Sequence, residues 1–261
     1  MDLVFLNSYL RSPWWLFRDK QSTRIKAIPL LTIKNTNTIC GHAEVFGSTY
    51  INELSHEYKK YGFELVYPSE KMSGLCIAYC PEKYELDTEP IFEKYVRSKL
   101  PDSMAPKGIF MCVFKCRYTR QKYPIIVTHL QSAYEESERS IHKVLKYREI
   151  QMLQLHQLQM FIIRNRLSNY VVMGDFNIDK MVSPILYELL ISQFNYHSKQ
   201  HLLPKMETYP LAKYSIDYIF TKGFVTRPTL VLNKEERQII EEHQIPSKYI
   251  SDHYGIHTFL E

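Results

Sequence analysis

The sequence predicts an α/β domain in which β-sheets pack together and helices cover them on the outside. Short apolar runs rich in β-branched residues, which are typical of buried strands, recur along the chain and often come in pairs. Segments with apolar residues at helical spacing interrupt these pairs. No internal repeat or linker is visible, so we expect a single catalytic domain over residues 1–261.

The expected elements follow from these runs and from the turn residues that bound them. The expected strands cover residues 2–6, 38–40, 63–67, 75–80, 109–116, 125–128, 170–173, 214–221 and 254–259. A turn joins the runs 109–116 and 125–128, which predicts an antiparallel pair. The expected helices cover residues 21–34, 49–61, 139–166 and 184–194, whereas residues 81–106 are more charged and less regular.

The longest expected helix carries an apolar stripe that should face a sheet. Its members are Val144, Leu155, Leu158 and Ile162. Arg148 and Gln151 fall on the same stripe, so we expect both side chains to reach buried polar partners.

Composition indicates a soluble globular protein and narrows the setting. The hydrophobic share is 45%, the charged share is 23% and the net charge is +5, a balance that tolerates a phosphate-rich partner or an anionic membrane without identifying either. No apolar run is long enough to cross a membrane, and no signal-peptide pattern is visible. The five cysteines make an odd set, so we expect an intracellular protein, cytoplasmic or peripheral at a membrane. Their spacing does not favour zinc.

Residues 170–180 contain the strongest functional signal. A short apolar run ends at Gly174 and is followed at once by Asp175 and Asn177. Side chains just beyond a strand end lie where α/β proteins commonly bind ligands. Taken alone, this stretch is better explained as a surface turn, because Gly, Asp and Asn are ordinary turn residues, and it is the recurrence of the arrangement elsewhere that favours a site.

The same arrangement of polar residues at expected strand ends recurs along the chain. These residues are Asn7, Glu44, His129, Asp175, Asn177, Asp217, Asp252 and His253. Carboxylate and amide oxygens suit Mg²⁺, and a histidine paired with an aspartate can move protons near neutral pH. Jointly, they are the groups needed to hydrolyse a phosphate ester with a divalent cation.

Four short segments resemble the signature segments of the endonuclease/exonuclease/phosphatase superfamily. They are residues 128–130 (Thr-His-Leu), 174–177 (Gly-Asp-Phe-Asn), 216–218 (Ile-Asp-Tyr) and 251–253 (Ser-Asp-His). Asn7 and Glu44 correspond to the early metal-side pair, although Ala43 stands where the family commonly has glutamine. The resemblance implies a four-layer α/β/β/α sandwich of two mainly antiparallel sheets flanked by helices.

Within this superfamily, the sequence is more similar to neutral sphingomyelinases than to nucleases. Residues 128–134 (Thr-His-Leu-Gln-Ser-Ala-Tyr) resemble their histidine segment, and Arg148 with Gln151 matches an Arg-x-x-Gln pair. Asp102 and Lys107 resemble the Asp…Lys-Gly loop beside their active site, although a charged loop between prolines is equally explained as a solvated loop.

The resemblance implies a role for each residue in metal-dependent phosphodiester hydrolysis. Glu44, Asn7 and Asp252 are the expected Mg²⁺ side, and Mn²⁺ is an alternative ion. The expected catalytic residues are His253 as the base, Asp217 to orient it, Asp175 and Asn177 to position water and phosphate, and His129 with Lys107 to stabilise negative charge.

The substrate implied by the resemblance is sphingomyelin or a related choline phospholipid, cleaved to phosphocholine and ceramide. Trp14, Trp15 and Phe17, between two arginines, are candidates for peripheral membrane contact, and packing in the core is the competing explanation. Two other functions remain open. One is a nuclease on the same scaffold, although no dense basic stripe with interleaved aromatics is visible, and the other is a catalytically inactive binding protein.

Overall fold

The structure is a computed structural model that describes residues 1–11, 21–100, 102–134, 140–194 and 207–261. The helices are α1 (Gln21–Thr32), α2 (Ser48–Lys59), α3 (Ile141–Arg164), α4 (Pro184–Phe194) and α5 (Asn233–Glu242). The strands are β1 (Asp2–Leu10), β2 (Thr38–Val45), β3 (Glu64–Val66), β4 (Cys76–Tyr79), β5 (Tyr84–Leu86), β6 (Ile91–Lys94), β7 (Gly108–Cys116), β8 (Lys122–His129), β9 (Tyr170–Asp175), β10 (Asp217–Lys222), β11 (Leu230–Val231) and β12 (Ile256–Phe259). No helix among these described residues is long and apolar enough to cross a membrane.

The strands form two mixed sheets within the described part of the chain. One six-stranded sheet has the order β11-β12-β1-β2-β4-β3, and the other has the order β10-β9-β8-β7-β5, with β6 also paired to β7. Each sheet contains one parallel pair, β1 with β2 and β8 with β9, and the remaining pairs are antiparallel. The expected antiparallel pairing of residues 109–116 with 125–128 is confirmed.

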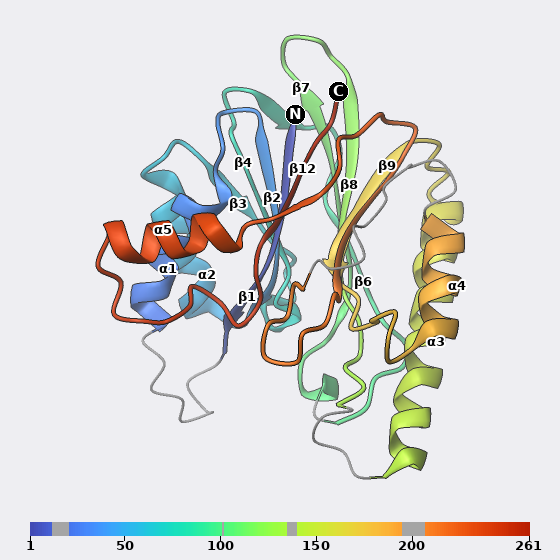
Figure 1. Ribbon diagram of the computed structural model, residues 1–261. Helices are drawn as coiled ribbons and strands as arrows, with labels where there is room; N and C mark the ends of the chain where they lie inside the picture. The colour runs from blue at the N-terminus through green and yellow to red at the C-terminus, as the bar shows by residue number, and fades with distance from the viewer. Residues whose placement is uncertain (12–20, 101, 135–139, 195–206) are drawn as a thin grey trace.

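The sheets pack face to face and helices cover both outer faces (Figure 1). Helices α1, α2 and α5 lie on one side of the sandwich, and α3 and α4 lie on the other. One apolar cluster fills the space between the sheets, a second lies beneath α1 and α2, and a third lies beneath α3 and α4. This is the expected four-layer α/β/β/α sandwich.

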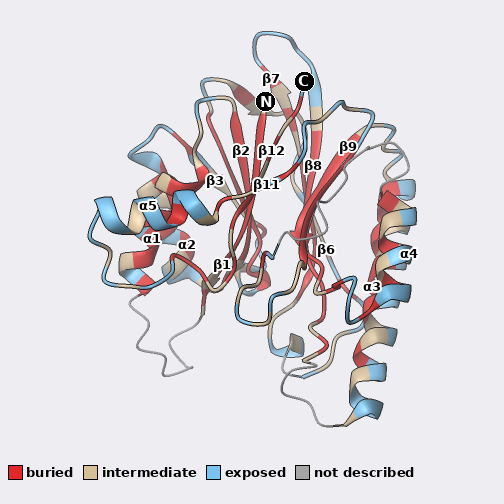
Figure 2. Cartoon of the chain, in the orientation of Figure 1, coloured by how far each residue is buried: buried red, intermediate tan, exposed pale blue. Residues whose placement is uncertain are grey.

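Burial on both faces explains why several strands read as continuous apolar runs rather than alternating ones. The central strands, such as β1, β2, β7 and β9, are buried along most of their length, while the helices are buried mainly on the side that faces a sheet (Figure 2). In α3, Leu155, Leu158 and Ile162 are buried as expected, whereas Val144 is only half-buried and Tyr147 takes the buried position nearby.

Several boundaries differ from the expected ones. Strand β1 continues to Leu10, so Asn7 lies inside the strand instead of after its end. Strand β10 begins at Asp217, so that residue starts the strand instead of lying within it. Residues 81–106 contain two short strands, β5 and β6, and the elements β11 and α5 had no expected counterpart. These four elements, β5, β6, β11 and α5, are short or mainly polar, so their sequences show little apolar periodicity.

The topology brings the ends of distant strands to one edge of the sandwich. Parallel pairing places the carboxyl ends of β8 and β9 together, and antiparallel pairing brings the start of β10 beside them. The register then aligns His129 with Asp175, and Asp175 with Asp217. In the other sheet, the carboxyl ends of β1 and β2 lie beside the start of β12 in the same way.

Candidate active site

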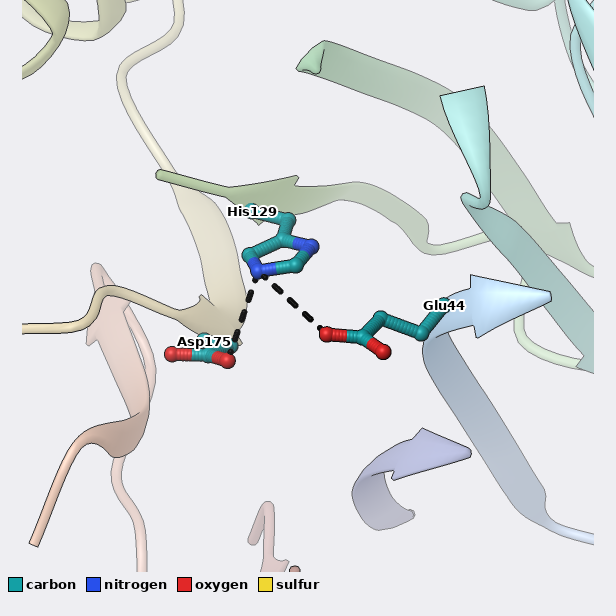
Figure 3. A group of neighbouring side chains, drawn as sticks. All are labelled: Glu44, His129 and Asp175. Carbon is teal, nitrogen blue, oxygen red and sulfur yellow. Dashed lines mark ion pairs between the residues drawn. The ribbon is translucent and has the colours of Figure 1, made fainter. Parts of the chain in front are cut away.

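A cavity of about 610 Å³ opens at the edge where these strand ends meet. Its polar lining includes Glu44, His129, Asp175, Asn177, Asp252 and His253. Both sheets contribute, because Glu44 comes from β2 while His129 and Asp175 end β8 and β9. The three side chains point toward one another (Figure 3). The structure therefore gathers residues that lie far apart in the sequence, as the strand-end pattern predicts.

His253 and Asp217 form a buried pair at one side of the cavity. The His253 Nδ1 atom lies 2.8 Å from Asp217 Oδ2, and both side chains are nearly inaccessible to solvent. Burial alone would lower the pKa of His253, but the Asp217 carboxylate, helped by Asp252 and Asp175, raises that pKa well above its ordinary value. This contact leaves Nε2 facing Asp175 Oδ2 at 3.9 Å. The pair has the arrangement of a histidine base oriented by a carboxylate.

Asp175 lies at the centre of the site. Its Oδ2 atom accepts a hydrogen bond from Asn7 Nδ2 at 3.0 Å and lies 3.4 Å from His129 Nε2. Its Oδ1 atom accepts from the backbone N–H of Asn177 at 2.9 Å. Burial, together with the neighbouring Asp217 charge, raises the pKa of Asp175 above its ordinary range. A positively charged ligand in the cavity would relieve this unfavourable burial of negative charge.

Lys107 and His129 form another part of the cavity wall. Lys107 Nζ lies 2.9 Å from His129 Nε2, donates to the Leu130 carbonyl at 2.7 Å and pairs with Asp102 Oδ1 at 2.8 Å. Burial, followed by the charge of Lys107, lowers the pKa of His129 well below its ordinary value. His129 is therefore neutral at pH 7, and Lys107 supplies the positive charge on this side of the cavity. Asp102 contacts the Lys107 ammonium, not the cavity centre.

The backbone around Asp175 explains why the run ends in Gly-Asp-Phe-Asn. A Cβ atom on Gly174 would lie 2.2 Å from the Thr128 carbonyl oxygen, so the close approach of β9 to β8 requires glycine. Asn177 adopts a left-handed conformation with φ of 53°, which asparagine tolerates better than most residues. The side-chain amide of Asn177 donates to the Leu130 carbonyl at 3.1 Å. Gln151, which was expected to reach a buried polar partner, donates its Nε2 to the Asn177 carbonyl at 2.8 Å.

The expected metal-side residues Asn7 and Glu44 meet beside Asp175. Asn7 Nδ2 donates to Glu44 Oε1 at 3.2 Å, while Asn7 Oδ1 accepts from the backbone N–H of Tyr9 at 3.2 Å. The register of β1 against β2 shifts just beyond Asn7, and both Tyr9 and Glu44 have positive φ values. Such an irregularity turns side chains of an otherwise regular strand into the site.

One group of potential ligand atoms fits a divalent cation. Atoms of Glu44, His129 and Asp175 all lie within 4.8 Å of one another, and a second such group comprises Asp175, Asp217 and His253. The carboxylate oxygens of the first group suit Mg²⁺ or Mn²⁺. Asn7 would need its amide rotated to offer an oxygen, because its nitrogen faces the carboxylates. Asp252 lines the cavity, and burial raises the pKa of its carboxyl group.

Three buried charged residues that hold the site together had no assigned role in the sequence. Arg24 donates to the carbonyls of Ile250 at 2.7 Å and Tyr9 at 2.8 Å. Glu236 accepts from the backbone N–H of Ile250 at 2.7 Å, which anchors the loop before His253. The spacing of Arg24 with Ile28 and Leu31 indicates its burial from the sequence, since it places a charged residue on the apolar side of α1.

Asp179 is the third buried charged residue that holds the site together. Its two carboxylate oxygens accept from the backbone N–H groups of Met181 at 2.7 Å and Ser215 at 2.8 Å. The side chain therefore links the turn after β9 to the segment that leads into β10.

The expected membrane-contact residues Trp14, Trp15 and Phe17 lie outside the described residues.

Solved structures match the whole of this chain at low sequence identity. Beta toxin from Staphylococcus aureus matches with a TM-score of 0.73 and 17% identity, covering 100% of this chain and 99% of that chain. An endonuclease/exonuclease/phosphatase family protein from Bacteroides thetaiotaomicron matches with a TM-score of 0.70 and 16% identity, covering 100% and 97%. The chain has the endonuclease/exonuclease/phosphatase fold.

Within this fold, a mutant of the Staphylococcus aureus beta toxin has been solved with bound magnesium ions. It matches with a TM-score of 0.70 and 19% identity, covering 100% of this chain and 99% of that chain. No protein-family model and no curated protein matches the sequence. The likeness therefore concerns the endonuclease/exonuclease/phosphatase fold, and the chemistry has to be argued from the site itself.

Proposed function

We propose that this protein is a metal-dependent phosphodiesterase that hydrolyses sphingomyelin or a related choline phospholipid. The observation that carries the proposal is the hydrogen-bonded pair of His253 and Asp217, 2.8 Å apart, facing the same cavity as Glu44 and Asp175. A base oriented by a carboxylate beside a group of cation ligands is the arrangement that phosphate-ester hydrolysis requires.

In the proposed reaction, His253 Nε2 accepts a proton from the attacking water while Asp217 holds the ring in position. The bond from phosphorus to the ceramide oxygen breaks, and that oxygen takes a proton from solvent. Asp175 and Asn177 position that water and the phosphate, and Lys107 with His129 stabilises the negative charge that develops on the phosphoryl oxygens. Glu44 and Asp175 would hold the cation, with support from Asn7 and Asp252. When bound, Mg²⁺ or Mn²⁺ supplies Lewis acidity toward a phosphate oxygen.

The lining of the cavity favours a lipid over a nucleic acid. Met72, Met104 and Val182 line it, and these side chains are 38%, 62% and 39% exposed. Apolar groups at an exposed mouth suit acyl chains or the surface of a bilayer. The acidic residues of the lining, which are Glu44, Asp102, Asp175, Asp179 and Asp252, outnumber the basic ones, Arg11 and Lys107, and this balance disfavours a polyanion. The protein would reach its substrate by peripheral contact with a membrane.

The test is hydrolysis by the purified protein of sphingomyelin vesicles, phosphatidylcholine vesicles and single- and double-stranded nucleic acid, each with and without Mg²⁺. We expect Mg²⁺-dependent release of phosphocholine, and we expect Asp175→Ala and His253→Ala to lower kcat at least about 10³-fold because each removes a group from the reaction itself. His56→Ala, an exposed histidine on α2, is the matched control.

Each other outcome has a definite meaning. Hydrolysis of nucleic acid in place of lipid identifies the nuclease alternative on the same site. Failure to hydrolyse any phosphodiester identifies the inactive binding protein. Undiminished activity of either alanine variant rules out the proposed site.

A further inference from the structure

A short hairpin places two tyrosines next to each other in the wall of the cavity. Tyr209 and Tyr214 exchange backbone hydrogen bonds, with N–H to O=C distances of 2.9 and 3.1 Å. Residues paired in this way across an antiparallel bridge project their side chains on the same face. Both residues line the cavity, so their rings form one aromatic surface within it.

This aromatic surface lies directly beside the proposed base. The Tyr209 ring centroid is 4.9 Å from that of the His253 ring, and the planes are inclined by 44°. Thr208 Oγ1 accepts from the N–H groups of Ile216 and Asp217 at 3.0 and 3.2 Å. The Thr208 carbonyl also accepts from the N–H of Tyr254 at 2.8 Å. The hairpin is thus fixed to both chain segments that carry the His253–Asp217 pair.

Acidic side chains of the cavity can balance a cation at the two rings, and one of them, Asp179, also lies near the Arg148 guanidinium. Asp179 and Asp252 line the same cavity as Tyr209 and Tyr214. An aromatic face attracts a cation through its negative quadrupole, and a quaternary ammonium, which has no N–H to donate, is suited to such a surface. In a choline phosphodiester only a two-carbon chain separates the ammonium from the phosphate ester oxygen. An aromatic surface adjoining His253 is therefore within reach of a head group whose phosphate lies at Asp175.

We propose that Tyr209 and Tyr214 form a subsite for the quaternary ammonium of a choline head group. This subsite rests on the proposed phosphodiesterase function and adds to it the residues that select the head group. The cavity that would bind the phosphate contains more acidic than basic residues. The subsite explains this excess, because the cationic end of a zwitterionic substrate would lie in the same cavity as its anionic end.

Calorimetric binding of phosphocholine, phosphoethanolamine and inorganic phosphate, with Mg²⁺ present, tests the subsite without any requirement for turnover. We expect the wild-type protein to prefer phosphocholine to phosphoethanolamine. Tyr209→Leu and Tyr214→Leu should each weaken phosphocholine binding about tenfold and leave phosphate binding unchanged, because only the ammonium loses its aromatic partner. Tyr209→Phe should retain the preference, and Tyr61→Leu, an exposed tyrosine outside the cavity, is the control.

Three possible binding results would overturn the proposed subsite. Equal loss of phosphocholine and phosphate binding in the leucine variants means that they disturb the phosphate site. Loss of the preference in Tyr209→Phe means that the hydroxyl group, not the ring, acts. A wild-type protein that binds phosphocholine no better than phosphoethanolamine has no such subsite.

Hydrolysis of vesicles containing sphingomyelin or ceramide phosphoethanolamine separates this inference from the proposed function. We expect the ratio of kcat/KM for the two lipids to fall about tenfold in Tyr214→Leu, mainly through KM for sphingomyelin. An unchanged ratio with full activity contradicts the subsite and leaves the phosphodiesterase standing. Absence of hydrolysis of either lipid by the wild-type protein contradicts the proposed function.

Discussion

His253 and His129 line the same cavity and both approach Asp175 Oδ2, with Nε2 atoms 3.9 and 3.4 Å away, yet their pKa values are shifted in opposite directions. Both are buried, so desolvation lowers the pKa of each. Asp217 reverses the effect at His253 and raises its pKa, whereas the Lys107 ammonium lowers the pKa of His129 further. Burial is common to both rings, and only at His253 does the charge of a neighbouring side chain overturn its effect on the pKa. The same residue type therefore suits proton transfer at His253, as proposed, and a neutral polar contact at His129.

This difference also gives the proposed cation a second role in the site. In the protein alone, three carboxylates hold the proton on His253, which is the wrong protonation state for a base. Neutralisation of Asp175 by a bound cation would weaken that hold and let His253 lose its proton nearer to neutral pH. Removal of the metal with a chelator should therefore abolish turnover by two routes, through the phosphate and through the base.

Among substitutions of the residues that set these two pKa values, the largest effect is expected from Asp217→Asn, which removes the carboxylate that distinguishes His253 from His129. We expect kcat to fall about 10²–10⁴-fold, because the ring loses its orientation and the stabilisation of its protonated form. Since Asp217 raises the pKa of His253, its loss should move the acid limb of the pH–rate profile to lower pH. The profile of purified Asp217→Asn, measured against wild type, checks both statements. A limb that stays in place would show that His253 does not titrate in this step.

A smaller effect is expected from Lys107→Met, which removes the charge beside His129. Loss of the ammonium should raise the pKa of His129 toward its ordinary value, because Lys107 is one cause of the lowering. We expect kcat to fall about 10–10²-fold, since a charge facing the phosphoryl oxygens is lost. NMR titration of the His129 ring measures the pKa, and Lys94→Met on exposed β6 is the control. An unmoved His129 pKa would show that burial alone sets it.

The smallest effect concerns Glu236, which anchors the loop on the His253 side only. Burial raises the pKa of Glu236 to about 7 from 4.5, so the folded protein holds a proton that the unfolded chain releases, and stability falls as the pH rises through that interval. Glu236→Gln cannot ionise and still accepts from Ile250. We expect it to exceed wild type in free energy of unfolding by about 1–3 kcal/mol near pH 8, and by nothing near pH 4.

Urea unfolding at both pH values measures this difference, and Glu241→Gln, exposed on the same helix, is the control. Activity of Glu236→Gln should stay close to wild type because the hydrogen bond to Ile250 is retained. Equal stability of Glu236→Gln and wild type at both pH values would mean that Glu236 is not desolvated.

Much of this architecture could be predicted from local pattern. The buried runs that became β7, β8 and β9 and the apolar stripe of α3 are signals carried by neighbouring residues, because burial of a face imposes a fixed period on the chain. The polar residues placed at strand ends, among them His129 and Asp175, followed from the same runs. Strands that are short or edge-like, such as β6 and β11, and the mainly polar α5 carry little of that signal and were missed.

The sequence by itself determined the residue types of the site and the strand ends that carry most of them. The family resemblance implied the pairing of Asp217 with His253, but only the tertiary structure decided that Lys107 meets His129 and that Glu236 meets the loop before His253. The physical reason is that a strand pattern reports burial along one segment, whereas a pKa or a ligand site depends on charges brought together by register and sheet packing. Such contacts join separate elements, and the hydrogen bond of Asn7 with Asp175 spans 168 positions, so no local pattern encodes them.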